Sequence, residues 1–228
     1  MKILIIMGSA RSVDNCPNEN SKTKEIVEFA IRGLKDSNNQ LIEFDILDLS
    51  ITNKSIILPC KGCISTAGGA HCHYPCDCYG SGDKLVDEDV YKRLEQADAF
   101  VVFSPIYWYS LTSQVKTLFD RLVCCNGTIT HDEAVKIFGK NLKNAKETKK
   151  FAHTVEFKEM QKNHYEGKIG AFFIQGDNGA DDYKEFDRTE LMPYARSIPD
   201  TFKELKEWFD PKMAAMPFVM QCRYSGIE

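Results

Sequence analysis

The clearest pattern of hydrophobic and polar positions in the chain lies between residues 98 and 122. Residues 99–103 form an unbroken run of apolar, β-branched and aromatic side chains, which predicts a strand buried on both faces of a parallel sheet. Ser104 and Pro105 are expected to end this strand. After a turn, apolar residues recur at helical spacing and predict an amphipathic helix with Ser110 as its N-cap. The stripe of that helix consists of Leu111, Val115, Leu118, Phe119 and Leu122.

Strands and helices are expected to alternate along the rest of the chain. Residues 2–7 predict a buried strand, and a helix begins near Ser21, where Asn20 or Ser21 can act as N-cap. Its apolar face consists of Ile26, Val27, Ala30, Ile31 and Leu34. Residues 40–49 predict an edge strand with one solvated face, because apolar and acidic residues alternate there. The alternating residues are Ile42, Phe44 and Ile46 against Glu43 and Asp45.

The second half of the chain gives weaker patterns. It predicts a short helix over 89–96, a strand over 168–174, a charged helical region with Phe202, Leu205 and Phe209 on one face, and a last strand over 217–222. Residues 126–167 predict a helical insertion that precedes the fourth strand. Thr130 and Glu133 have the spacing of a capping box, and Val135, Phe138 and Leu142 form a narrow apolar stripe. The nine lysines between Lys136 and Lys168 alternate with acids, which is typical of a solvated face.

Composition places the chain among ordinary globular proteins. Its 228 residues favour one domain over 1–228, and its hydrophobic content of 43% is typical of a packed core. A net charge of −4 argues against a nucleic-acid partner. We also expect no membrane association, since no apolar run approaches the length of a span. The nine cysteines are an odd number without an export signal, so a reducing, cytoplasmic location is expected.

Two loops at the carboxyl edge of the predicted sheet have the character of ligand sites. Residues 8–12 follow the first strand and lead to the helix that begins near Ser21, so backbone N–H groups and a helix N-terminus face a common point. A phosphate is the expected ligand, and a polar loop that binds nothing is the alternative. The spacing excludes both G-x-x-x-x-G-K-[ST] and G-x-G-x-x-G at this position. After the central strand, residues 106–109 form an aromatic cluster that either covers the sheet edge or faces a flat ligand.

The segment SPIYWYSLTSQVKTLFDR resembles the flavin-contacting loop of the NADPH-dependent FMN reductase and flavodoxin-like flavoprotein family. The family pattern is S-P-x-Y, then S, then K-x-x-x-D-R, and it is matched by Ser104, Pro105, Tyr107, Ser110, Lys116, Asp120 and Arg121. The first loop, G-S-x-R followed by N-S-x-T, resembles the ribityl-phosphate loop of the same family, although its eight residues between Ser12 and Ser21 make it longer than usual. The resemblance implies phosphate contacts from Ser9, Arg11, Ser21, Lys22 and Thr23. It implies ring contacts from Pro105, Ile106, Tyr107, Trp108, Ser110, Gly176 and Asp177.

This resemblance implies a fold and an activity. The fold is α/β, a flavodoxin-like, doubly wound, five-stranded parallel sheet of order 2-1-3-4-5. The activity is an FMN oxidoreductase that takes electrons from NAD(P)H and passes them to a flavin, a quinone or a similar small acceptor. The cofactor carries the difficult step in such proteins, so no catalytic side chain is predicted. An electron carrier reduced by a protein partner and a thiol or metal module remain alternatives. A homodimer or higher homo-oligomer is expected, in which the insertion covers the flavin site of its own or a neighbouring chain.

A cysteine-rich loop over 50–88 adds a second candidate chemistry. Five of the nine cysteines fall within nineteen residues, beside His71 and His73, and offer enough ligands for zinc or a four-cysteine iron–sulfur cluster. The five are Cys60, Cys63, Cys72, Cys76 and Cys78. The motif resembles that of iron–sulfur flavoproteins, except that residues 64–71 separate the first pair from the third cysteine. Reduced thiols packed in the loop are the favoured alternative, so less than stoichiometric metal is expected there.

Overall fold

A parallel sheet forms the centre of the molecule, a computed structural model that describes residues 1–14, 18–36, 41–51, 56–107, 110–139, 145–176 and 211–227. The parallel strands lie in the order β2-β1-β3-β5, so the first and third strands are internal and the second is at an edge, as predicted. A short strand, β4, turns back antiparallel onto the end of β3. The bounds are β1 Lys2–Met7, β2 Glu43–Asp48, β3 Ala99–Tyr107, β4 Ser110–Leu111 and β5 Ile169–Gln175. The sheet confirms the flavodoxin-like α/β architecture.

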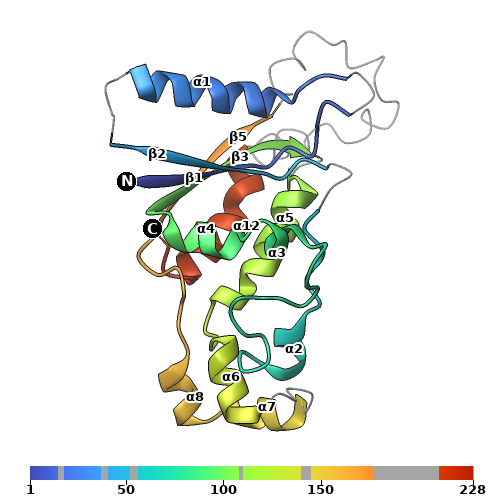
Figure 1. Cartoon of the computed structure of the whole chain (residues 1–228), viewed down its shortest axis with the longest axis vertical. Coiled ribbons are helices and arrows are strands. Elements are labelled where there is room, and N and C mark those ends of the chain that lie inside the picture. Colours follow the sequence, from blue (N-terminus) through green and yellow to red (C-terminus); the bar gives the residue numbers. More distant parts are fainter. Residues whose placement is uncertain are drawn as a thin grey trace, which may run out of the picture.

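Helices cover both faces of this sheet (Figure 1). On one face α1 (Lys22–Asp36) packs through Val27 onto Ile5 and Met7. The alternate side chains of β1, Leu4 and Ile6, enter the larger core on the opposite face. That face carries α3 (Lys84–Asp87), α4 (Val90–Gln96), α5 (Ser113–Arg121), the 3₁₀ turn η1 (Leu122–Cys125) and α12 (Pro211–Tyr224).

The predicted insertion forms a lobe below the sheet, beyond the C-terminal end of α5 (Figure 1). The lobe contains α2 (Cys63–Ala67), α6 (His131–Phe138), α7 (Ala145–Phe151) and α8 (Val155–Met160). Its small core consists of Ala70, Ile129, Ala134 and Phe157, so the cysteine-rich loop and the insertion pack on each other. The capping box of Thr130 and Glu133 is confirmed. The ring of Phe138 lies 5.4 Å from that of Phe151, so the apolar stripe has its partner inside the chain, while Leu142 lies outside the described residues.

The predicted last strand over 217–222 is wrong, because these residues belong to helix α12. Ala215, Phe218 and Cys222 are buried at helical spacing, whereas Met216 and Met220 are exposed. A strand would have placed alternate residues on one face, and the burial follows the helical period instead. Pro217 lies inside the helix. The charged region that carries Phe202, Leu205 and Phe209 lies outside the described residues.

The end of the central strand also differs from the prediction. Strand β3 continues through Ser104 and Pro105 to Tyr107, because Pro105 is in register with Gln175 of β5 and Tyr107 pairs with Ser110 of β4. A proline keeps its carbonyl acceptor and is tolerated where its nitrogen has no partner in the ladder. Ser110 is therefore extended and cannot cap the helix. Thr112 is the N-cap of α5, and its hydroxyl accepts a hydrogen bond from the N–H of Val115.

Strand β2 lies at the sheet edge, where Glu43 is exposed and Phe44 packs on the core as predicted, but Asp45 and Ile46 depart from the predicted alternation. Ile46 is 43% exposed, whereas Asp45 points toward α4 and accepts hydrogen bonds from Arg93 at 3.0 and 2.7 Å. These bonds hold the pKa of Asp45 below its ordinary value. The ion pair makes the partial burial of Asp45 compatible with its charge. No helix in the described part of the chain has the length and apolar character of a membrane span.

Candidate functional site

The loop after β1 is fixed at the carboxyl edge of the sheet by its neighbours on both sides. The N–H of Gly8 donates to the carbonyl of Phe103 at 2.7 Å, and the hydroxyl of Thr112 donates to the carbonyl of Gly8. On the other side, the N–H of Ile51 donates to the carbonyl of Ala10 at 3.0 Å. The loop therefore lies where ligands bind in doubly wound sheets.

Gly8 allows α5 to approach this loop closely. A Cβ at position 8 would lie 2.4 Å from Cγ2 of Val115 and 3.0 Å from Cβ of Ser104. A larger residue would push the N-terminal turn of α5 away from β1. The glycine of the G-S-x-R segment is thus required by packing between strand and helix, whatever the loop binds.

The hydroxyl groups predicted to hold a phosphate are buried around the N-terminus of α1. Ser9, Ser21 and Thr23 are 4%, 7% and 1% exposed. Ser21 caps the helix by accepting from the N–H of Lys24 at 3.2 Å, and Ser9 accepts from the N–H of Arg11 at 3.2 Å. The first N–H groups of a helix have no intrahelical acceptor and favour an anion, so this end of α1 suits a phosphate.

The remaining predicted phosphate contacts lie on the solvent side of this group. Lys22 is exposed at the start of α1. The guanidinium of Arg11 lies 3.4 Å from a carboxylate oxygen of Glu19. Arg11 is therefore held beside an acid in the ligand-free chain, at the point where the loop is longer than in the resembled family.

The third loop is joined to the first by a contact that sequence analysis missed. The side-chain amide of Gln175, the last residue of β5, donates to the hydroxyl of Thr23 at 2.6 Å. The next residue, Gly176, is so close to the second loop that a Cβ there would lie 2.8 Å from Cδ1 of Ile106. Three loops from β1, β3 and β5 thus meet at one edge.

The structure describes only part of the predicted ring site. Pro105 and Ile106 are half-buried at the end of β3, and Tyr107 is 44% exposed. Ser110 pairs with Tyr107 across the hairpin. Trp108 and Asp177 lie outside the described residues. The described part of the edge therefore has buried hydroxyls at the N-terminus of α1 and an exposed tyrosine at the end of β3, side chains that fit the phosphate and the ring of FMN.

A family model matches most of the chain. The model described as NADPH-dependent FMN reductase matches residues 1–185, which includes all three loops. The chain belongs to this family. Membership also agrees with the parallel sheet and its strand order.

Two further proteins match about half of this FMN reductase family member, each at less than 30% identity. Two proteins called "Iron-sulfur flavoprotein" match it, from Methanosarcina thermophila with 28% identity over 126 residues and from Archaeoglobus fulgidus with 29% identity over 124 residues. Each match covers 54% of this chain, and the chain spans 53% and 46% of the two relatives, about half their length.

Solved structures give weaker likenesses. A flavoenzyme NAD(P)H:(acceptor) oxidoreductase, FerB, from Paracoccus denitrificans has 16% identity and a TM-score of 0.36, over 76% of this chain and 59% of that one. An apo NADH:FMN oxidoreductase has 15% identity and a TM-score of 0.36, over 92% and 86% of the two chains. At these TM-scores neither match adds to the fold assignment, which rests on the sheet and the family.

Three of the five predicted cysteines gather in the loop between β2 and α3, and we call Cys63, Cys76 and Cys78 the cysteine cluster. The Sγ atom of Cys78 lies 3.9 Å from that of Cys63 and 3.4 Å from that of Cys76. Cys60 lies on the adjacent turn, where its sulfur accepts from the N–H of Gly62 at 3.3 Å, and Cys72 is buried. The described cysteines are free thiols. Sulfur ligands of this number and softness suit zinc or an iron–sulfur cluster.

Within this cluster one thiol is much more acidic than the others. The hydrogen bond between the side chains of Cys76 and Cys78, together with the Arg121 guanidinium, lowers the pKa of Cys76 to about 5. The same interaction and burial raise the pKa of Cys78 above its ordinary value. Burial is also the main reason that the pKa of Cys72 is raised. The cluster therefore favours the thiolate form of Cys76 over that of Cys78.

Arg121, which matches the family pattern, anchors the cysteine loop instead of lining the flavin edge. Its guanidinium lies 2.7 Å from the carboxylate of Asp83, and both side chains are fully buried. It also donates to the carbonyls of Leu58 at 2.9 Å and Cys76 at 3.3 Å. The loop is thereby fixed at both ends to the last turn of α5.

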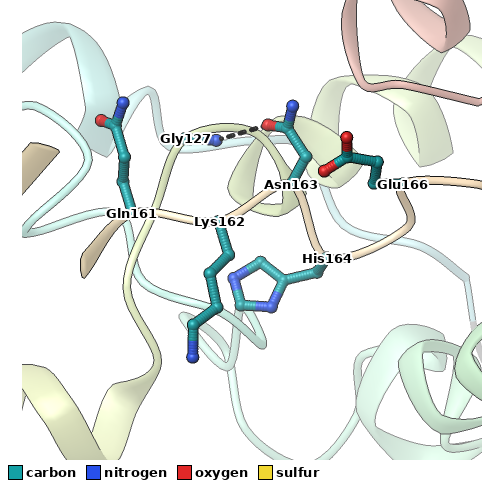
Figure 2. Close-up of a pocket in the computed structure, with 6 residues that line it drawn as sticks. All are labelled: Gly127, Gln161, Lys162, Asn163, His164 and Glu166. Atoms are coloured by element: carbon teal, nitrogen blue, oxygen red, sulfur yellow. Dashed lines mark hydrogen bonds between the residues drawn. The ribbon is translucent and has the colours of Figure 1, made fainter. Parts of the chain in front are cut away.

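A separate depression of about 490 Å³ lies in the lobe (Figure 2). It is lined by Gly127, Gln161, Lys162, Asn163, His164 and Glu166. The side chain of Asn163 accepts from the N–H of Gly127 at 3.1 Å, and the His164 ring stacks on Tyr74 at 4.0 Å. Burial lowers the pKa of His164. No sequence pattern pointed to this depression, and its residues come from the lobe and not from the three loops.

Proposed function

We propose that the protein is an FMN-dependent oxidoreductase that takes electrons from NADH or NADPH and passes them to a flavin, a quinone or a similar small acceptor. The observation that carries the proposal is the meeting of three loops at the carboxyl edge, joined by the hydrogen bond from Gln175 to Thr23. Family membership supports the same conclusion.

Different residues at this edge would contact the phosphate and the ring of FMN. Ser9, Ser21 and Thr23, with the N-terminus of α1, would hold the phosphate, while residues 105–107 and Gly176 would lie along the ring. When bound, FMN supplies the capacity to accept a hydride and to release electrons one or two at a time. The protein supplies position and a polar surrounding, and no acid, base or nucleophile is assigned.

Steady-state oxidation of NADH and NADPH by the FMN-loaded protein tests this function. With a quinone, free flavin or ferricyanide as acceptor, we expect turnover that depends on bound FMN. An FMN-loaded protein that oxidises neither nucleotide with any of these acceptors contradicts the proposal and favours an electron carrier reduced by a protein partner.

The cysteine cluster favours a second candidate, an iron–sulfur flavoprotein in which a cluster exchanges electrons with the flavin. The close approach of Cys63, Cys76 and Cys78 supports it, as do the names of the two curated relatives. Anaerobic purification followed by iron and sulfide analysis separates the candidates. We expect less than stoichiometric iron, and four irons with matching sulfide per chain would establish the second candidate.

A further inference from the structure

Two histidines and an aspartate converge in the lobe at a place that the flavin site does not use. The ligand atoms of His73, Asp77 and His131 all lie within 4.8 Å of one another. His73 and Asp77 belong to the cysteine-rich loop, whereas His131 is the first residue of α6. We propose that this group is a binding site for one first-row divalent cation of the zinc type, which joins the cysteine-rich loop to the insertion.

The backbone holds the two histidine-bearing segments side by side. The N–H of Tyr74 donates to the carbonyl of Ile129 at 2.9 Å, and the N–H of His131 donates to the carbonyl of Tyr74 at 3.0 Å. The two imidazole rings consequently lie 4.7 Å apart between centroids. The ligands come from rigid positions on both sides of this bridge, which is the arrangement that a metal site requires.

The orientation of His73 also fits a ligand. Its Nδ1 lies 3.0 Å from the carbonyl of His71, so an Nδ1–H donates there and leaves the lone pair of Nε2 free. Backbone carbonyls orient metal-binding histidines in this manner. The Nε2 atom lies 3.3 Å from a carboxylate oxygen of Asp77, and two lone pairs at this distance repel unless a proton or a cation lies between them.

The distances match the geometry of a small cation. Ligands bound at about 2.1 Å around a tetrahedral zinc ion are about 3.4 Å apart. The observed 3.3 Å separation of His73 and Asp77 is close to this value, and His131 reaches the same spacing by a movement of about 1.5 Å at most. A proton could join His73 to Asp77, but only a cation uses the third ligand as well. Because the carboxylate of Asp77 is 59% exposed, water can complete the coordination.

The charges nearby are compatible with a cation. The first turn of α6 contains Asp132 and Glu133, which offset the positive end of the helix beside His131. The ammonium of Lys162 lies 3.5 Å from the carboxylate of Glu133, which offsets its charge. The two imidazole ligands favour zinc, cobalt and similar ions over calcium or magnesium.

Titration of the full-length, EDTA-treated protein with Co²⁺ under anaerobic conditions and a non-thiol reductant tests the proposal. Cobalt is the probe because thiolate ligands give an intense near-ultraviolet charge-transfer band, whereas nitrogen and oxygen ligands give only weak visible bands. We expect one Co²⁺ per chain without the charge-transfer band. His131→Ala and Asp77→Asn should each weaken binding by about tenfold or more, and the exposed His153→Ala should leave it unchanged.

Melting in EDTA separates loss of the site from loss of the fold. We expect Asp77→Asn to melt in EDTA at the wild-type temperature and to lose the rise in melting temperature that Zn²⁺ gives the wild-type protein. Three results would overturn the proposal: no Co²⁺ binding, wild-type affinity in both variants, or an intense charge-transfer band that places the ion on the cysteines.

Discussion

At the scale of single residues, Cys76 has the chemistry most changed by its surroundings. Its thiol lies between the Cys78 thiol and the guanidinium of Arg121, and its pKa falls from the ordinary 9.0 to about 5. Cys222 is an equally buried thiol without such partners, and burial raises its pKa to about 11. The two residues differ in neighbours and not in exposure, so the comparison isolates the effect of the cluster.

We predict that one thiolate titrates near pH 5 in the reduced protein. Because the folded pKa of Cys76 is depressed, its ionisation stabilises the fold fully above pH 9, and this contribution is lost as the pH falls through about 5. Thiolate absorbance at 240 nm should show a step near pH 5 that Cys76→Ser removes and Cys222→Ser retains. A step near pH 9 in place of the step near pH 5 contradicts the assignment.

At the scale of elements, the turn between β3 and α5 depends on Thr112. Its hydroxyl accepts from Val115 and donates to Gly8, so it caps the helix and holds the phosphate loop. We predict that Thr112→Ala lowers the free energy of unfolding by about 1–2 kcal/mol, and that Ser110→Ala, the cap expected from sequence, changes it by less than about 0.5 kcal/mol. Urea unfolding of both variants measures the difference. Equal effects would mean that Ser110 shares the capping role.

The buried pair of Arg121 and Asp83 joins α5 to the cysteine loop. We predict that Asp83→Ala lowers the free energy of unfolding by about 3–5 kcal/mol, because it leaves the guanidinium buried without a counter-ion. The matched control is Asp120→Ala, which breaks the exposed pair with Lys116 on the same helix and should cost about 0.5 kcal/mol or less. Similar losses in the two variants would show that burial does not decide the strength of the pair.

The elements that sequence predicted well are those with one unambiguous pattern. Strand β1, helix α1, the part of the predicted stripe that lies in α5 and the capping box of α6 have the expected positions, because local periodicity and buried packing agree there. In α12 local propensity and buried packing conflict. Val219 and Phe218 favour a strand, whereas the buried side chains Ala215, Phe218 and Cys222 follow the helical period. Residues such as Gln175 and His131 could not be assigned, since their roles depend on register and loop packing between distant segments.

At the scale of the whole molecule, the apolar stripe of the insertion no longer explains the expected homodimer. The insertion packs on the cysteine-rich loop, and Phe138 of its predicted apolar stripe packs on Phe151 within the same lobe. Apolar surface is exposed instead on the α1 face of the sheet, where Phe29 is 73% and Phe173 is 47% exposed. We propose that the contact between two copies of the chain includes Phe29, the more exposed of the two.

We predict that sedimentation at micromolar concentration gives about twice the chain mass of 25.9 kDa. Phe29→Glu should shift the protein toward the monomer without loss of folded structure, because it places a charge on the proposed contact. A wild-type monomer of about 26 kDa at this concentration would remove the dimer from the account.

The central claim is that the three loops form an FMN site, and the residues around α1 allow a specific test of it. Ser21→Ala and Thr23→Ala remove buried hydroxyls at the proposed phosphate position. Each hydrogen bond to a charged group contributes about 1.5–3 kcal/mol, so each variant should bind FMN at least about tenfold more weakly. Ser65→Ala, in the cysteine-rich loop, is the control that should bind as the wild type does.

Reconstitution of the wild-type protein with FMN is the most direct measurement. We predict flavin absorbance equivalent to about one FMN per chain after removal of free flavin. At an FMN concentration of about 100 times Kd, binding should stabilise the fold by about 2.7 kcal/mol and raise the melting temperature by about 5–10 °C. A protein that retains no flavin absorbance and shows no FMN-dependent rise in melting temperature would contradict the central claim.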